Sequence, residues 1–257
     1  MLDVTEVNLS TLIAHRIPMV GTPLPSGCLS VVVPCFNEVE SVGLCVERIL
    51  NEPIVGEVIV VDDGSTDGTR EVLSALSDPR VQVLHHEANL GKGAALRTGF
   101  ALVSTEYVVV QDSDLEQDPS DYTQLVTPLS SGIADVVYGS RFPDRRRLPG
   151  QYLMHFWANR FLTVLSNLFT GLRLTDMETG YKAFRTEVLQ GIRIEENCFG
   201  VEPELTAKIA AANWRIVEVR VSYAPRSFDS GKKIGWKDGL RALYCIVRYS
   251  DDHKKVD

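Results

Sequence analysis

The interpretation of this chain starts from the stretch Val108-Val109-Val110-Gln111-Asp112-Ser113-Asp114-Leu115-Glu116-Gln117-Asp118-Pro119. Its three β-branched residues favour a buried strand that runs directly into an acidic loop. Asp112 and Asp114 are two positions apart, so both carboxylates can turn toward one hard cation such as Mg²⁺ or Mn²⁺. Asp118 precedes Pro119 and fits better as the cap of a following helix.

A calcium loop and a solvated loop compete with this metal site. A calcium loop of the EF-hand type needs Gly at its sixth position and Glu at its twelfth, where this chain has Gln117 and Thr123. The calcium loop is therefore excluded. A solvated acidic loop stays open, because acids that follow a strand are common in α/β domains. The rest of the chain must decide between a metal site and a solvated loop.

Composition narrows the class of protein. The 257 residues, 44% of them hydrophobic, predict one large domain with a single substantial core. The net charge of -8 argues against nucleic-acid binding, yet a few local Arg and Lys residues could still hold a phosphate-bearing substrate. The five cysteines, without a Cys-x-x-Cys pair, fit a reducing cytosol. Because the N-terminal residues are acidic, we expect no signal peptide. The sequence has no run of about eighteen apolar residues, so we expect no membrane-spanning helix.

Short apolar runs alternate with helical patterns along the chain, which predicts βαβ units and a mostly parallel sheet. Strands are expected at 29–34, 57–61, 81–84, 107–111, 134–138 and 215–222, with an extended segment at 176–185. Helices are expected from about residue 38, after residue 68, and at 91–103, 119–129, 152–169, 202–212 and 236–249. Residues 1–27 are expected to form a tail or arm, and residues 251–257 a second tail.

Three strand ends carry unusual chemistry: 34–38, 62–65 and 112–114. In an open α/β sheet the ligand lies outside the carboxyl ends of the strands, so these segments should gather along one edge. Gly91-Lys92 lacks the upstream Gly and following Ser or Thr of a P-loop, and Gly91-x-Gly93 lacks the third Gly of a dinucleotide fingerprint. Kinases and dehydrogenases are therefore disfavoured.

Several motifs together resemble a known family. Val-Val-Val-Pro-x-Phe-Asn-Glu, Val-Val-Asp-Asp-Gly-Ser-Thr-Asp-Gly-Thr, Asn-x-Gly-Lys-Gly-Ala-Ala and Gln-Asp-x-Asp look like family 2 glycosyltransferases with the GT-A fold. The segments that begin at Tyr138, Asp176 and Arg226 look like the dolichol- or polyprenyl-phosphate sugar transferases, most closely the mannosyl branch. The resemblance implies a Rossmann-like, three-layer α/β/α nucleotide-diphospho-sugar transferase domain over residues 28–250.

The resemblance also implies a set of site residues. Phe36 would stack on the base, Asp63 would hold the base or ribose, and Glu116, where the mannosyl branch often has Gln, would join the metal ligands. The implied metal ligands are Asp112, Asp114 and Glu116. The implied acceptor contacts are Arg141, Thr179 and Lys182. The implied catalytic residues are Asp112, Asp114, Arg141, Arg226 and Lys232. The implied contacts to the nucleotide sugar are Pro34, Phe36, Glu38, Val61, Asp63, Asp112, Ser113, Asp114, Arg226 and Lys232.

Elementary chemistry is consistent with these roles. A nucleoside diphosphate that leaves accumulates negative charge, which a divalent cation and Arg or Lys donors stabilise. A lipid monophosphate has a second pKa of about 6 and is largely anionic at neutral pH, so it needs no strong general base. A hydroxyl acceptor would need a carboxylate base, for which Glu202 and Asp176 are the candidates.

The sequence therefore predicts a metal-dependent, inverting transferase of mannose or glucose from GDP-mannose or UDP-glucose to a polyprenyl or dolichyl phosphate. It is expected in the cytoplasm, bound peripherally to a membrane through the aromatic-rich helix at 152–169, with a membrane-anchoring subunit as a further candidate partner. The alternatives are an enzyme of the same fold with a hydroxyl acceptor, and a non-catalytic nucleotide-sugar binder.

Overall fold

The structure is a computed structural model that describes residues 24–142, 153–225 and 236–250. Nearly all of the predicted N-terminal tail and the whole of the predicted C-terminal tail lie outside these ranges. The predicted domain boundaries therefore stay predictions.

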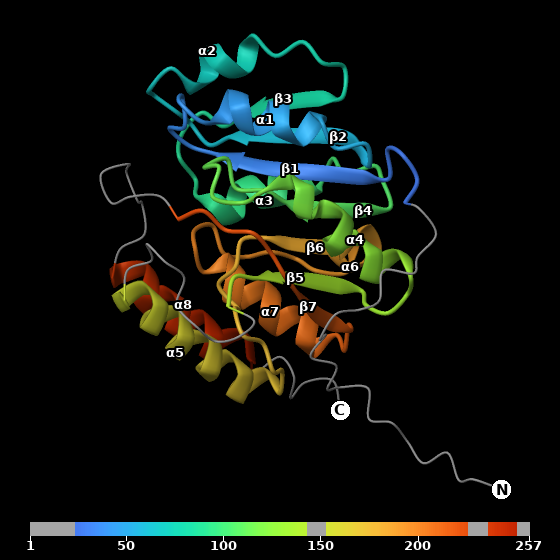
Figure 1. The fold of residues 1–257 in the computed structure, drawn as a ribbon. Coiled ribbons are helices and arrows are strands. Elements are labelled where there is room, and N and C mark those ends of the chain that lie inside the picture. The colour runs from blue at the N-terminus through green and yellow to red at the C-terminus, as the bar shows by residue number, and fades with distance from the viewer. Residues whose placement is uncertain (1–23, 143–152, 226–235, 251–257) are drawn as a thin grey trace, which may run out of the picture.

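A seven-stranded sheet runs through the middle of the described molecule in the order β3-β2-β1-β4-β6-β5-β7 (Figure 1). Its strands are β1 (Leu29–Cys35), β2 (Val55–Asp62), β3 (Val81–His85), β4 (Tyr107–Val110), β5 (Val136–Ser140), β6 (Lys182–Arg185) and β7 (Ile216–Arg220). Neighbouring strands are parallel except where β6 pairs antiparallel with both β4 and β5. The prediction of a mostly parallel sheet is confirmed.

Helices connect and cover these strands. They are α1 (Val42–Leu50), α2 (Thr69–Ser74), α3 (Lys92–Phe100), α4 (Tyr122–Ser130), α5 (Leu153–Thr170), α6 (Thr186–Gln190), α7 (Val201–Ala211) and α8 (Trp236–Ser250), and a 3-10 turn, η2 (Pro119–Asp121), precedes α4. Two details differ from the expectation. Helix α1 begins at Val42 because residues 38–41 form a turn in which the Glu38 carbonyl accepts from the Ser41 and Val42 amides. The short α6 was not predicted.

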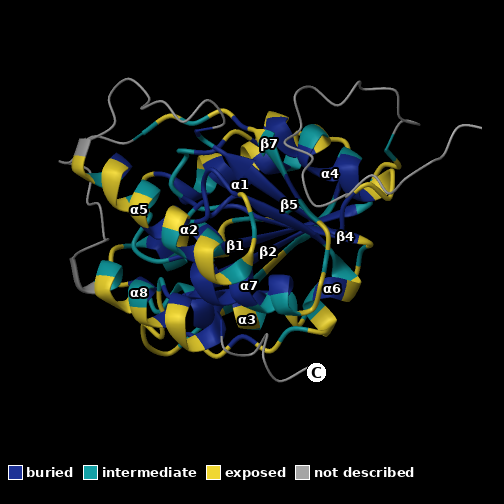
Figure 2. Ribbon diagram, turned by 90° about the horizontal axis from the view of Figure 1, so that it is seen from below, coloured by how far each residue is buried: buried dark blue, intermediate teal, exposed yellow. Residues whose placement is uncertain are grey.

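Two apolar cores lie on opposite faces of the sheet, because side chains alternate along each strand. Val31 and Val33 pack with α1, α2 and α4, whereas Val32 and Val108 pack with α3, α6, α7 and α8. Figure 2 shows the buried strands between outer helices whose far sides are exposed. The predicted three-layer α/β/α arrangement is confirmed.

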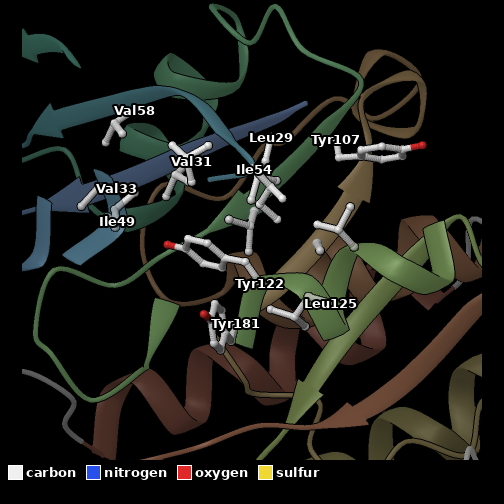
Figure 3. Close-up of a cluster of buried hydrophobic side chains, with 14 of the residues drawn as sticks. Leu29, Val31, Val33, Ile49, Ile54, Val58, Tyr107, Tyr122, Leu125 and Tyr181 are labelled. Carbon is white, nitrogen blue, oxygen red and sulfur yellow. The ribbon is translucent and has the colours of Figure 1, made fainter. Parts of the chain in front are cut away.

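The first core also fixes the acidic loop that follows β4. Tyr122 and Tyr181 meet edge to face at 6.0 Å within the cluster drawn in Figure 3. The Tyr122 hydroxyl donates to Gln111 Oε1 at 2.9 Å, and the Tyr181 hydroxyl donates to the Asp118 carbonyl at 2.8 Å. Both ends of the loop are thereby attached to packed aromatic rings.

The direction of β6 brings a distant segment to the same place. An antiparallel strand begins where its parallel neighbours end, so the residues just before Lys182 lie beside the carboxyl ends of β4 and β5. The predicted extended segment at 176–185 is a strand only over its last four residues. Its first part is a loop that faces the acidic stretch.

Candidate active site

The three strand ends that were predicted to share one edge do come together. Ser113 Oγ donates to the Pro34 carbonyl at 3.2 Å, which joins the loops after β4 and β1. The Asp63 amide donates to the Cys35 carbonyl at 2.8 Å, which joins the loops after β2 and β1. This edge of the sheet is the candidate active site.

The loops after β1 and β2 hold each other through polar side chains. Asn37 has a φ of 52°, and its Oδ1 accepts from the Thr66 amide at 2.8 Å. The Glu38 amide donates to Thr69 Oγ1 at 2.9 Å. Two predicted nucleotide contacts, Phe36 and Glu38, lie in this cross-linked pair of loops. A third, Val61, is fully buried in β2, so its side chain is a core residue and offers no surface to a ligand.

Asp63 is fixed from several directions. Its Oδ1 accepts from the Leu90 amide at 3.0 Å and lies 2.7 Å from His86 Nδ1, while its Oδ2 accepts from the Gly91 amide at 2.7 Å. His86 Nε2 in turn lies 2.9 Å from Thr98 Oγ1. The carboxylate is therefore held rigidly where the resemblance expects a base or ribose contact, and that role stays a prediction.

The acidic loop turns sharply after Asp114. Leu115 has a φ of 62°, and the Glu116 amide donates to Asp114 Oδ1 at 3.1 Å. Gln117 spans the turn, because its Oε1 accepts from the Asp112 amide at 3.0 Å and its Nε2 donates to Asp112 Oδ2 at 3.3 Å. The two aspartates are thus set by the loop's own hydrogen bonds.

Lys92, at the start of α3, contacts Asp112, although its sequence pattern predicted no role for it. Its Nζ lies 2.8 Å from Asp112 Oδ1 and 3.2 Å from Glu202 Oε1. Burial alone would lower the pKa of this ammonium, but Asp112 and Glu202 raise it on balance. Lys92 therefore stays charged between the two carboxylates.

The glycines that flank Lys92 account for its position. A Cβ on Gly91 or Gly93 would overlap the carbonyl oxygens of Asn197 and Glu196. The start of α3 can pack against that segment only without side chains there. The Gly-Lys-Gly pattern was the sequence signal for Lys92, although its partners could not be read from it.

Lys182 was predicted to contact the acceptor, but the structure buries it. Its side chain is 1% exposed, its Nζ donates to the Met177 carbonyl at 3.1 Å, and it is ion-paired with Glu202. Thr179, another predicted acceptor contact, is also buried and donates its hydroxyl to the Gly139 carbonyl at 2.8 Å. Both residues lie beneath the site and support its loops, in place of the direct contact that was expected.

Arg141 follows β5 and forms a bidentate pair with Asp176. Its Nε and Nη2 lie 2.7 and 2.8 Å from the two carboxylate oxygens, and Asn159 Nδ2 donates to Asp176 Oδ1 at 2.8 Å. Burial alone would raise the pKa of Asp176, but the Arg141 guanidinium lowers it on balance. The Arg141 side chain stays 17% exposed, so it is accessible to a ligand.

Neither predicted general base is available as one. Asp176 is bound to Arg141, and Glu202 lies between Lys92 and Lys182. The carboxylate that differs is Glu178, which was not predicted to lie in the site. Its Oε1 is buried and makes no hydrogen bond within the described part of the chain. Burial first, and Glu202 second, raise the pKa of Glu178 to about 7.

The fit of these residues to a divalent metal can be judged from their donors. Within residues 24–142, 153–225 and 236–250, no three His, Cys, Asp or Glu side chains gather at metal-binding distance. Glu116 Oε2 accepts from the Tyr223 hydroxyl at 2.5 Å, and the place of Glu116 among the metal ligands stays a prediction. Asp112, 29% exposed, and Asp114 would supply oxygen ligands, a donor set that fits Mg²⁺ or Mn²⁺ completed by water and phosphate oxygens.

Arg226 and Lys232, the predicted clamp on the leaving diphosphate, lie outside the described residues. Their role stays a prediction.

The α/β sheet, with its acidic pair at the carboxyl edge, has the GT-A fold. A profile of glycosyl transferase family 2 matches residues 30–193, and the chain belongs to this family.

Relatives agree with that assignment. The chain is 31% identical to an undecaprenyl-phosphate mannosyltransferase of Micrococcus luteus, over 85% of this chain and 92% of that protein. It is 30% identical to a polyprenol monophosphomannose synthase of Mycolicibacterium smegmatis, over 84% of each chain. Among solved structures it resembles the glucosyl-3-phosphoglycerate synthase of Mycobacterium tuberculosis with Mg²⁺ and UDP, at 25% identity and a TM-score of 0.65, over 86% of this chain and 79% of that chain. The same enzyme with Mn²⁺, UDP and phosphoglyceric acid gives 24% identity and a TM-score of 0.66, over 86% and 78%.

Proposed function

We propose that this enzyme transfers mannose or glucose from a nucleotide sugar to a polyprenyl phosphate, with a divalent metal and with inversion at the anomeric carbon. The observation that carries the proposal is the arrangement of Asp112, Asp114 and Arg141 on one edge of the sheet, in a chain whose relatives include polyprenyl-phosphate mannosyltransferases.

Asp112 and Asp114 would hold the metal. When bound, the metal supplies a Lewis acid that neutralises the diphosphate as it leaves. Lys92 keeps the Asp112 carboxylate oriented and places a permanent positive charge beside it. Arg226 and Lys232, by the family resemblance, would complete the binding of the diphosphate.

The charged side chains favour a phosphate over a hydroxyl as the acceptor. A hydroxyl must lose its proton to a base; the predicted bases Asp176 and Glu202 are paired with cations, which leaves Glu178 as the carboxylate of this cluster that could accept it. A monoester phosphate is already anionic. The Arg141 guanidinium has five N–H donors. Two of its hydrogen bonds go to the Asp176 carboxylate, so further donors remain for a phosphate.

Peripheral binding to the cytosolic face of a membrane is part of the proposal. No helix in the described ranges is both long enough and apolar enough to cross a bilayer. Helices α5 and α8 lie side by side (Figure 1) and carry large exposed apolar side chains: Met154, Trp157, Phe161, Val164, Leu168, Phe169, Leu240, Tyr244 and Val247. Although the chain's net charge is -8, α5 contains no Asp or Glu. Such a face suits an anionic lipid surface that also contains the lipid acceptor.

The test is transfer of radiolabelled sugar from GDP-mannose and from UDP-glucose to a short polyprenyl phosphate, with Mn²⁺ and with a chelator. We expect a lipid-linked product that disappears with the chelator and in Asp114→Ala. The matched control is Glu87→Gln, which changes an exposed carboxylate that follows β3 and should transfer normally.

Other results would change the proposal. Consumption of the donor with transfer only to a hydroxyl compound would replace the phosphate acceptor. Donor binding without any turnover would indicate a nucleotide-sugar binder. If neither donor binds, the proposal is wrong.

A further inference from the structure

Glu178 lies in the loop between Asp176 and β6, within a cluster of ionised side chains. The other carboxylates of the cluster are occupied: Asp176 by Arg141, Glu202 by Lys92 and Lys182, and Glu218 by the amides of Thr175 and Asp176. Within the described part of the chain, Glu178 Oε1 is the buried side-chain polar atom without a hydrogen bond. Buried polar atoms are nearly always satisfied, so this oxygen is available to a bound water or to a ligand atom.

The surroundings of Glu178 define which ligand would fit. Arg141 at the end of β5 and Lys182 on β6 act on it as positive charges, whereas Glu202 on α7 and Asp176 in its own loop act as negative charges. Both cations already have a carboxylate partner. A fully ionised Glu178 is therefore poorly compensated, and burial together with Glu202 raises its pKa to about 7.

We propose that Glu178 contacts the acceptor phosphate directly, and that its carboxyl group and the phosphate share a single proton. This inference rests on the proposed function, and it adds an acceptor-binding residue that contributes recognition of an ionisable acceptor. Arg141, which is paired with Asp176, would supply the positive charge to the same phosphate.

The proton balance is simple. The acceptor binds either as a dianion to protonated Glu178 or as a monoanion to ionised Glu178. A phosphate oxygen then forms the bond to the anomeric carbon as the bond from that carbon to the nucleoside diphosphate breaks. The product is a phosphodiester monoanion without a titratable proton near neutral pH, so the shared proton ends on Glu178 and passes to water.

A shared proton predicts a particular pH profile. The second pKa of a monoester phosphate is about 6. Above about pH 7, Glu178 and the phosphate are both ionised and repel each other, so kcat/KM for the acceptor should fall about tenfold per pH unit. Below about pH 6 the pair holds one proton too many, and kcat/KM should fall again. In Glu178→Gln the alkaline fall should vanish, because the amide cannot ionise.

The experiment measures kcat/KM for a short polyprenyl phosphate from pH 5.5 to 9 in the wild type, in Glu178→Gln and in Glu187→Gln. Glu187 is the matched control, since its carboxylate is exposed and paired with Arg185. The kcat/KM of Glu178→Gln divided by that of the wild type should rise about tenfold per pH unit above pH 7, so that the variant has the higher kcat/KM at pH 8.5. The KM of Glu178→Gln for the nucleotide sugar should stay within about twofold of the wild-type value. A merely structural defect would instead change the kinetic constants for both substrates.

The outcomes separate the two claims. A wild type that transfers no sugar to any polyprenyl phosphate overturns the proposed function, and this inference with it. A wild type that transfers sugar, with an alkaline fall that persists in Glu178→Gln, overturns only the role of Glu178. If the Gln variant does not fold, the wild type and Glu178→Asp decide: both must show the alkaline fall, and a flat wild-type profile from pH 7 to 9 overturns the inference.

Discussion

Gly180 shows how tightly the loop before β6 packs on the proposed metal site. A Cβ at this position would overlap Asp112 Oδ2 and lie 2.8 Å from Lys92 Nζ. We expect Gly180→Ala to displace one of these groups and to weaken binding of the nucleotide sugar with Mn²⁺ at least about tenfold, or ~1.4 kcal/mol. Isothermal titration with the donor measures this.

Gly239→Ala is the control for that substitution. A Cβ there would meet nothing within 4 Å, and Gly239 lies inside α8. It should leave donor binding unchanged and stabilise the protein by roughly 0.5–1 kcal/mol, because Ala favours a helix over Gly. Equal donor affinity in Gly180→Ala and the wild type would contradict the close packing described.

Two glutamates that pair with residues of β6 should differ greatly in their effect on stability. Glu202 is buried between Lys92 and Lys182, whereas Glu187 is exposed beside Arg185. Glu202→Gln removes the carboxylate partner of the buried Lys182 ammonium and leaves Lys92 paired with Asp112 alone, so it should lower the free energy of unfolding by about 3–5 kcal/mol. Glu187→Gln should cost less than about 1 kcal/mol. Urea denaturation of both variants checks the difference, and similar costs would contradict it.

The residues that the sequence could reveal are those marked by a local pattern. Asp112, Asp114 and Asp63 each follow an apolar strand, and the rule for strand ends placed them correctly at one edge. The partners of Lys92 and Lys182 could not be found in this way, because they are set by packing between α3, β6 and α7. Glu178 was missed for the same reason, since its environment is made by residues far from it in sequence.

At the scale of elements, β7 holds the loop that follows α5. Glu218, on β7, accepts from the Thr175 amide at 2.8 Å and from the Asp176 amide at 3.1 Å. Burial raises the pKa of Glu218 to about 7, although the Thr175 and Asp176 hydrogen bonds oppose this. Glu218 and Glu178 are thus two carboxyl groups near one loop that stay protonated to a higher pH than ordinary carboxyl groups.

These groups predict how stability changes with pH. Between pH 4.5 and 7 the folded protein binds these protons while the unfolded chain, with ordinary carboxyl pKa values, has lost them. Stability should therefore fall as pH rises through this window, and the loss should be complete above about pH 7. Groups with lowered pKa values, such as Asp62 and Asp176, titrate below pH 3.8 and do not interfere.

Urea titrations at pH 5 and 7.5 test the pH effect. Glu218→Gln keeps an acceptor for the two amides and cannot ionise, so the stability difference between the two pH values should shrink in this variant. An unchanged difference would contradict the raised pKa of Glu218.

Elements were predictable where hydrophobic periodicity is strong. The buried runs of β1, β2 and β4 and the amphipathic α5 and α8 were found close to their observed ends. Periodicity could not find the turn before α1, because Asn37 is held with a positive φ by hydrogen bonds to a different loop. Nor could it separate the loop at 176–181 from the four-residue β6, whose pairing with β4 and β5 is non-local.

For the whole molecule, the exposed side of α5 and α8 predicts reversible binding to lipid vesicles. Phe161 and Leu168 are 60% and 77% exposed. Each apolar side chain that enters the interface contributes about 1.5–3 kcal/mol, so Phe161→Glu with Leu168→Glu should lower the vesicle partition coefficient at least about a hundredfold. Sedimentation with vesicles that contain anionic lipid measures this.

Ile133→Glu is the control for the surface, since Ile133 is an exposed apolar residue that follows α4, a helix that lies apart from α5 and α8 (Figure 1). It should not change partitioning. A wild type that ignores vesicles would contradict the membrane proposal and would direct attention to a protein subunit as the occupant of this face.

The position of β6 also has a consequence for how the chain is made. Strands β1 to β4 are complete once Val110 has left the ribosome, yet the far edge of β4 stays unpaired. Strand β5 is translated next, but it does not pair with β4, because β6 (Lys182–Arg185) lies between them in the finished sheet and is translated later. At about 5–20 residues per second, the nascent protein spends several seconds with the far edge of β4 and both edges of β5 unpaired. Chains that terminate before Lys182 should therefore aggregate or require a chaperone, even though most of their strands are present.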